Sequence, residues 1–195
     1  MQYQLIVIGT SLGGFNALRK IFSALPKNFP VPIVVVQHRD KESDETFTQF
    51  LQKESKLIIT ETHDKDPIRS GFIYVAPADY HVFVEDNRLC LSLDSPVKFS
   101  RPSIDVLFES AAREMKERLI GIILTGANCD GAEGLAAVKA RGGFTMVQDP
   151  KSAEAPRMPE AAIEACRVDQ VVPLEKIVPV LKHLVYKKQR NNSST

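Results

Sequence analysis

The stretch LIVIGTSLGG, residues 5–14, decides the fold of this chain. It begins with a short run of branched apolar residues, which is typical of a strand buried on both faces of a parallel sheet. Glycines end the run, and apolar residues at three- and four-residue spacing then predict a helix from Gly14 to Leu25, which stops before Pro26. A second apolar run, residues 33–36, completes a βαβ unit and predicts parallel strands.

One part of the chain departs from this alternation of strands and helices. Three strand-like runs follow one another at residues 72–75, 81–84 and 89–93, and Asp86-Asn87 between the last two predicts a tight turn. We therefore expect a single doubly wound α/β fold with a mostly parallel sheet, helices on both faces and a local antiparallel β-hairpin insertion.

The remaining segments return to the alternating pattern. The sequence predicts one domain at residues 1–186 and, because residues 187–195 contain no apolar side chain, a disordered tail after it. In a helix starting at Ser43, Phe47, Phe50 and Leu51 are expected to share one face. The other expected strands are residues 57–59, 120–124, 144–147 and 168–172, and the other expected helices begin at Ser103, Gly131, Pro159 and Leu174.

Composition excludes several classes of protein. The chain has 195 residues, 44% of them hydrophobic, and a net charge of +1, which suits one domain core and disfavours an electrostatic nucleic-acid binder. No apolar run approaches the roughly 20 residues of a membrane span, and we expect no secretion signal, because the first residues lack its pattern. Cys90, Cys129 and Cys166 have neither disulfide nor metal-ligand spacing, so we expect reduced thiols, no metal and a cytoplasmic location.

Chemically active side chains follow three of the predicted strands. Ser11 comes after the first strand, His38 after the second, and Asp130 after the strand at 120–124. Ligands of open parallel sheets collect beyond the carboxyl ends of the strands, so we expect these three side chains at one edge of the sheet.

The residue types suit nucleophilic catalysis. GTSLG, residues 9–13, fits the G-x-S-x-G pattern that presents a serine hydroxyl on a tight strand-to-helix turn. Serine needs a base within hydrogen-bond reach, and the base needs an acceptor on its other nitrogen, so His38 and Asp130 are the candidates. The Leu12 N–H, together with an N–H from the loop at 125–130, is a candidate oxyanion donor.

Other interpretations of these residues remain open at this point. A glycine-rich turn after a first strand can also bind phosphates, although Ser11 here takes the place of the middle glycine of G-x-G-x-x-G. The same turn could also be purely structural. His38 and Asp130 would equally suit a core histidine and a helix N-cap. Cys129 is a nucleophile by type, but nothing adjacent activates it, and a partly buried thiol is favoured. His63, His81 and His183 show no metal-ligand spacing and are expected to be structural.

At these residues the chain resembles the catalytic domain of the CheB-type protein-glutamate methylesterases. The resemblance implies that Ser11 is the nucleophile, His38 the general base and Asp130 its orienting partner, with no cofactor. It implies hydrolysis of glutamyl methyl esters on chemoreceptor cytoplasmic helices, with glutamine deamidation as a related activity. Oxyanion or substrate contacts are implied for Leu12, Ala127, Asn128 and Met158. The matching motifs are VIGTSLGG (7–14), VVVQH (34–38), SGFIYVAPADYH (70–81), RPSIDVLFESAA (101–112), ILTGANCDGAEGL (123–135) and MPEAAI (158–163).

The chain departs from the family pattern at three places. Leu12 stands where threonine is usual, Ala127-Asn128-Cys129 where Met-Gly-Asn is usual, and Arg157 where glycine is common. The receiver domain that commonly precedes the catalytic domain is not expected, because the first strand begins close to Met1. The protein would then be either constitutively active or controlled by a separate regulatory partner. The alternative function is a catalytically silent or differently targeted binding module on the same fold.

Overall fold

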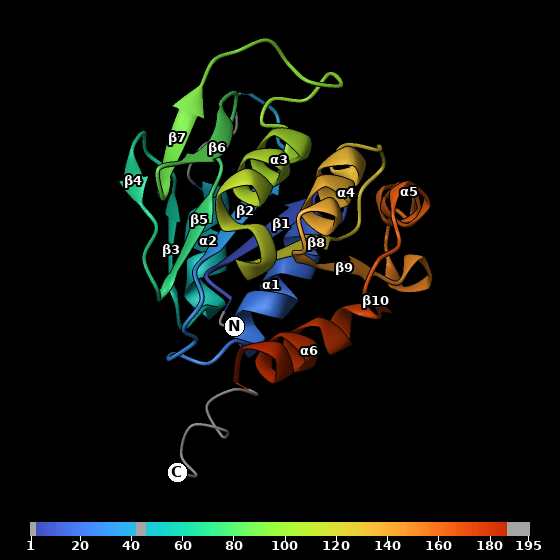
Figure 1. The fold of residues 1–195 in the computed structure, drawn as a ribbon. Helices are drawn as coiled ribbons and strands as arrows, with labels where there is room; N and C mark the ends of the chain where they lie inside the picture. Colours follow the sequence, from blue (N-terminus) through green and yellow to red (C-terminus); the bar gives the residue numbers. More distant parts are fainter. Residues whose placement is uncertain (1–2, 42–45, 187–195) are drawn as a thin grey trace.

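Seven parallel strands form the main sheet of the computed structural model, which describes residues 3–41 and 46–186 (Figure 1). Every neighbouring pair in this sheet is parallel. The strands are β1 (Leu5–Thr10), β2 (Ile33–Gln37), β3 (Ile58–Glu61), β5 (Phe72–Val75), β8 (Leu119–Ile123), β9 (Phe144–Gln148) and β10 (Gln170–Val172), and their order in the sheet is β10-β9-β8-β1-β2-β5-β3.

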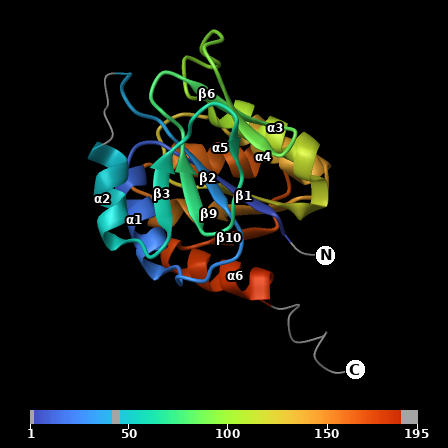
Figure 2. The same cartoon turned by 90° about the vertical axis from the view of Figure 1, so that its left-hand side faces the viewer.

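Helices cover both faces of this sheet (Figure 2). One layer consists of α1 (Gly14–Ala24), α2 (Thr46–Glu54) and α6 (Leu174–Tyr186), and the other of α3 (Ile104–Met115), α4 (Ala132–Ala140) and α5 (Arg157–Ala165). Ile6 and Ile8 of β1 pack into the first layer, whereas Leu5 and Val7 pack into the second. All four are fully buried, which explains why the first strand is continuously apolar. Two short 3-10 helices, η1 (Lys116–Arg118) and η2 (Pro150–Ser152), complete the helical segments.

A second, smaller sheet lies beside α3 (Figure 1). It consists of β4 (Asp66–Pro67), β6 (His81–Glu85) and β7 (Arg88–Ser92), antiparallel in the order β4-β7-β6. Asp86 and Asn87 form the predicted tight turn, with φ of 49° and 59°. The hairpin insertion is therefore confirmed.

The prediction for residues 72–75 was wrong. They form β5, which lies between β2 and β3 in the main sheet and pairs in parallel with both. Ile73 and Val75 are fully buried there. A four-residue apolar run has no periodicity that distinguishes a parallel core strand from a hairpin strand.

Packing explains two features of the predicted helices, namely side-chain exposure in α2 and the proline inside α6. In α2, Leu51 is buried, Phe47 is partly buried and Phe50 is half exposed, so the face that carries these three residues is only partly covered. The expected start at Ser43 lies outside the described residues. The helix α6 runs through Pro179 without interruption. Proline removes one backbone donor, but the buried face of Ile177, Val178, Leu181 and Val185 holds the helix against the sheet.

The chain order places one end of the sheet at a topological switch point. From β1 the chain builds one half of the sheet through β2, β3 and β5, and it returns to the other side of β1 with β8, β9 and β10. Crevices that bind ligands open at such a reversal, beyond the carboxyl ends of the strands. The segments after β1, β2 and β8 are those that carry Ser11, His38 and Asp130.

Candidate active site

Ser11 lies on a tight turn between β1 and α1. Its N–H donates to the carbonyl of Thr125 after β8 at 3.0 Å, and its carbonyl accepts from the Gly14 N–H at 2.9 Å. Gly13 has φ of 79°, in the left-handed region that favours glycine, and a Cβ there would lie 2.7 Å from Glu154 Cβ. The turn therefore needs glycine both for its backbone conformation and for the approach of Glu154.

Gln37, the last residue of β2, joins this turn to His38. Its side-chain Nε2 donates to the carbonyl of Ser11 at 2.8 Å and to the carbonyl of His38 at 2.9 Å. Gln37 is 6% exposed, so both bonds are shielded from water. Sequence reasoning did not single out Gln37, although its position at a strand end next to His38 was a usable signal.

His38 and Asp130 are brought together from 92 residues apart. The His38 Nε2 lies 2.8 Å from Asp130 Oδ2, and the Asp130 side chain is fully buried while that of His38 is 14% exposed. An ionised carboxylate only accepts hydrogen bonds, so this contact places the histidine proton on Nε2. The other ring nitrogen, Nδ1, lies 3.2 Å from the Asn128 amide nitrogen, which donates to it.

Asp130 also holds the start of α3. Its Oδ1 accepts from the Ser103 hydroxyl at 2.9 Å and from the Asp105 N–H at 3.1 Å, and its Oδ2 accepts from the Ile104 N–H at 2.7 Å. The interpretation of Asp130 as an N-cap of its own following helix is therefore wrong, because it caps α3 instead. Ser103 stands at the N-cap position of α3 but makes no side-chain capping bond, since its hydroxyl donates to Asp130.

Asp105 does the same for α4. Its Oδ1 accepts from the Gly131 N–H at 2.9 Å and the Gly134 N–H at 2.7 Å, and its Oδ2 accepts from Lys98 Nζ at 2.8 Å. Each of two neighbouring helices is thus capped by an aspartate that belongs to the other helix or its leading loop. This exchange fixes the loop that carries Asp130.

The two carboxyl groups respond differently to their surroundings. Burial by itself raises the pKa of Asp130, but hydrogen bonds from His38 and from the Ile104 and Asp105 N–H groups outweigh it and hold that pKa below its usual value. Burial is the main cause that raises the pKa of Asp105, and the neighbouring Asp130 carboxylate adds to it. The site therefore keeps Asp130 in the ionised form that orients a histidine.

Ser11 and His38 line one open cleft of about 450 Å³. Both residues line the cleft, but no hydrogen bond joins Ser11 Oγ to His38 in the described part of the chain. Such contacts often tighten only when substrate binds. The cleft is lined by Ser11, Leu12, Gly13, Gly14, Phe15, Asn16, Gln37, His38 and Glu154.

The residues predicted for oxyanion or substrate contact lie in different places. Leu12 lines the cleft, and the structure gives its N–H no hydrogen-bond acceptor among the described residues. Ala127 is exposed but does not line the cleft. Asn128 contacts His38, and its Oδ1 accepts from the Asp130 N–H at 3.1 Å. Met158 is 1% exposed, packs over Gly126 and is not among the residues that line the cleft.

The remaining candidate residues lie outside the cleft. Cys129 is exposed, contrary to the partly buried thiol that was expected. His81 is buried, with Nδ1 accepting from the Ser103 N–H at 3.1 Å, so it supports the segment that bonds Asp130. Arg157 is exposed and pairs with Glu164 at 3.5 Å. The described residues contain no group of His, Cys, Asp and Glu suited to a metal ion, and none of their helices is long and apolar enough to cross a bilayer.

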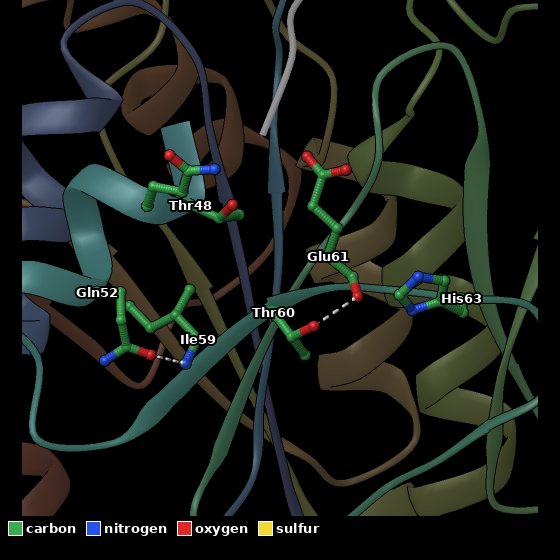
Figure 3. A pocket seen from close by; sticks show the side chains of 7 residues that line it. Thr48, Gln52, Ile59, Thr60, Glu61 and His63 are labelled. Atoms are coloured by element: carbon green, nitrogen blue, oxygen red, sulfur yellow. Dashed lines mark hydrogen bonds between the residues drawn. The ribbon is translucent and has the colours of Figure 1, made fainter. Parts of the chain in front are cut away.

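A second hollow, of about 350 Å³, lies between α2 and the edge strand β3 (Figure 3). Gln52 bridges its walls, with Oε1 accepting from the Ile59 N–H at 2.8 Å and Nε2 donating to the Leu57 carbonyl at 3.0 Å. Because both ends of this amide are used by the backbone, the hollow presents no free polar group from Gln52. It contains none of the predicted site residues.

Comparison with known proteins agrees with this architecture. Residues 6–181 match the family model described as CheB methylesterase. A Leptospira interrogans protein, whose name provisionally calls it a protein-glutamate methylesterase/protein-glutamine glutaminase, is 49% identical over 185 residues that cover 94% of this chain and 96% of that protein. The protein-glutamate methylesterase/protein-glutamine glutaminase 2 of Anaeromyxobacter dehalogenans is 40% identical, with 93% of this chain covering 53% of its length.

A solved structure shows the same fold. The CheB methylesterase catalytic domain of Thermotoga maritima superimposes with a TM-score of 0.89 and is 34% identical, over 95% of this chain and 100% of that domain. The segment that matches the family model includes Ser11, His38 and Asp130. This chain therefore belongs to the CheB methylesterase family.

Proposed function

We propose that this chain is a serine esterase that hydrolyses glutamyl methyl esters on proteins to glutamate and methanol, with deamidation of glutamine as a second activity. Ser11, His38 and Asp130 are its nucleophile, general base and orienting acid, and residues 1–186 are its catalytic domain. The observation that carries the proposal is the His38–Asp130 hydrogen bond of 2.8 Å at the rim of a cleft that Ser11 also lines.

The first half of the reaction transfers the acyl group to Ser11. The hydroxyl oxygen of Ser11 attacks the ester carbonyl while its proton passes to His38. The receiving atom is Nδ1, because Nε2 is already bonded to Asp130. Since Asn128 donates to the same Nδ1 in the free enzyme, this amide gives way as Ser11 approaches. The C–O bond to the methoxy group then breaks, and methanol leaves with the proton from His38.

The second half releases glutamate. A water molecule gives a proton to His38 Nδ1 and attacks the acyl carbon, and the bond to Ser11 breaks as the serine oxygen takes that proton back. The Leu12 N–H is the donor we assign to the oxyanion of both intermediates, because it borders the cleft and has no other acceptor among the described residues. Asp130 stays ionised throughout.

The substrates we propose are methylated glutamates on the cytoplasmic helices of chemoreceptors. The support is membership of the CheB methylesterase family and an open cleft with no lysine or arginine among its described lining residues, which suits a neutral ester on a protein surface. A cytoplasmic location follows from that substrate. Control by a separate regulatory partner completes the proposal, and adding purified receiver domains to a methanol-release assay would test it.

The deciding experiment measures methanol release from a methylated chemoreceptor cytoplasmic fragment. We expect release by the unsubstituted protein and a loss on the order of 10⁴ to 10⁶ in turnover for Ser11→Ala and for His38→Ala. A Cys129→Ala variant is the matched control for a nearby nucleophilic side chain outside the cleft. Equal release by the Ser11→Ala variant would contradict the assignment of Ser11, and absence of release from every methylated fragment would favour a binding module.

A further inference from the structure

Glu154 is the only acidic residue among the described side chains that line the cleft, and the proposed acyl transfer does not use it. Its side chain lies across the turn that carries Ser11 between β1 and α1, here called the nucleophile turn. Its Oε2 is 2.8 Å from the position that a Cβ on Gly13 would occupy. The carboxylate is thus beside the turn that carries Ser11 and the Leu12 N–H. It makes no hydrogen bond or ion pair with another described residue, and the described lining of the cleft contains no lysine or arginine to neutralise it.

Hydrogen bonds of the neighbouring Ala155 hold the backbone that carries Glu154. The Ala155 N–H donates to Thr125 Oγ1 at 2.8 Å, and the Ala155 carbonyl accepts from the Gly126 N–H at 2.9 Å. Thr125 Oγ1 in turn donates to the carbonyl of Leu12 at 2.9 Å. These bonds tie the segment that carries Glu154 to both the nucleophile turn and the loop after β8. The backbone at Glu154 is therefore held in place, while its side chain is exposed to solvent at the cleft.

We propose that Glu154 is a specificity residue that disfavours the anionic glutamate product and so separates it from the neutral ester and amide substrates. The inference rests on the proposed function, because it concerns the product of that reaction. It assigns to Glu154 an electrostatic role in product release that no part of the acyl transfer requires.

The charge balance of the reaction explains why only the product is affected. When the Ser11 proton moves to His38, the oxyanion carries one negative charge and the imidazolium one positive charge, so the net charge of the cleft does not change. The same holds in the second half, in which water is the attacking group. Only when the released acid loses its proton to solvent does the bound state gain one negative charge. A carboxylate beside the cleft therefore repels the product more than it disturbs the substrate or the intermediates.

The expected size of the effect is measurable. Two unit charges about 6 Å apart, in surroundings of intermediate polarity, repel by an amount equivalent to about a tenfold change in affinity. Because the cleft is open to water, salt weakens this repulsion: the screening length is about 10 Å at 0.1 M salt and about 3 Å at 1 M.

The experiment compares the binding of two unmethylated receptor fragments that differ only at the methylation site, one with glutamate and one with glutamine. Binding is measured in a Ser11→Ala background, so that neither fragment is turned over, with and without Glu154→Gln. We expect the parent to bind the glutamine fragment more tightly than the glutamate fragment, and Glu154→Gln to reduce this preference about tenfold. Raising the salt from 0.05 M to 1 M should reduce the preference in the parent but not in the variant. Glu109→Gln, the same charge change on an exposed residue of α3 outside the cleft, is the matched control.

The outcomes separate this inference from the proposed function. An unchanged preference in Glu154→Gln, or an equal change in Glu109→Gln, would overturn the role of Glu154 even if methanol release by the Ser11-containing enzyme is normal. In turnover assays the matching readout is the ratio of the product inhibition constant to KM for the ester, which should fall about tenfold in Glu154→Gln. Lack of methanol release by the Ser11-containing enzyme would instead refute the proposed function, and this inference with it.

Discussion

Replacing Asp130 by asparagine changes one atom of the site and disturbs two structures at once. The carboxylate accepts four hydrogen bonds, from His38 Nε2, Ser103 Oγ and the N–H groups of Ile104 and Asp105. An asparagine has one acceptor oxygen and one donor nitrogen. In one orientation the nitrogen faces the Ile104 N–H, and in the other it faces the Asp105 N–H, so one buried backbone donor loses its acceptor either way.

The magnitude follows from these contacts. An unsatisfied buried N–H costs about 1–3 kcal/mol, and loss of a negative charge at a helix N-terminus costs about 0.3–1 kcal/mol. We therefore expect Asp130→Asn to lower the free energy of unfolding by about 1–4 kcal/mol at pH 7. By analogy with other Ser-His-Asp hydrolases, turnover should fall on the order of 10⁴, because the amide no longer selects the histidine tautomer with its proton on Nε2.

The acid limb of the stability curve provides a second test. The pKa of Asp130 is lower in the folded protein than in the unfolded chain, where it is about 3.9. The ionised carboxylate therefore stabilises the fold above that unfolded pKa, and this contribution is lost as the pH falls through the lower folded pKa. The difference in stability between the parent and Asp130→Asn should be constant above about pH 5 and should narrow below about pH 4.

Urea denaturation followed by circular dichroism gives the stabilities, and methanol release under fully folded conditions gives the turnover. Ser103→Ala is the matched control, because it removes one hydroxyl bond to Asp130 Oδ1 and leaves the His38 contact in place. It should lose about 1 kcal/mol and less than tenfold in turnover. An Asp130→Asn protein as stable as the parent, or one that retains more than a tenth of its turnover, would refute the reasoning.

Three further predictions test the supporting contacts. Gly14→Ala would place a Cβ 2.0 Å from Gln37 Oε1, so the free energy of unfolding from thermal denaturation should fall by about 1–3 kcal/mol, and turnover should also fall. A variant with the stability and turnover of the parent would show that the Gln37 amide moves freely. Gln37→Ala removes both hydrogen bonds that join the turn at Ser11 to His38, and it should lower kcat about 10- to 100-fold. Gln52→Ala is the control, because it removes comparable bonds to the backbone between α2 and β3. It should lower only the stability. Asp105→Asn keeps the oxygen that caps α4 and loses only the bond from Lys98. In urea denaturation, its free energy of unfolding should fall by less than about 1 kcal/mol, whereas that of Asp105→Ala should fall by about 2–3 kcal/mol. Equal losses would contradict the capping assignment.

Local patterns in the sequence predicted most of the elements. The apolar run at residues 5–8 and the helical spacing at 174–186 correspond to β1 and α6, since burial on one or two faces leaves a periodic trace in the chain. The placement of the chemistry followed from topology: parallel strands end at one edge, so residues after β1, β2 and β8 were expected to be neighbours. His38 and Asp130 are in hydrogen-bond contact there.

Other features could not be predicted from the local sequence. Residues 72–75 have the composition of a strand in either sheet, and only their long-range pairing with β2 and β3 decides which one they join. The half-exposed Phe50 and the buried Met158 depend on which neighbour covers each position. The capping of α3 by Asp130 and of α4 by Asp105 joins residues 25–29 apart, which no spacing rule connects.

The sequence by itself thus determined the fold class, the order of elements and which polar side chains leave the strand ends, because these depend on periodicity and on a topology that parallel strands impose. The tertiary structure decided which atoms meet: that His38 presents Nε2 to Asp130, that Gln37 bonds both the nucleophile turn and the base, and that Glu154 lies over Gly13. These contacts depend on side-chain directions set by packing between distant segments. The differences in free energy between alternative contacts are small compared with the free energy gained by burying the core.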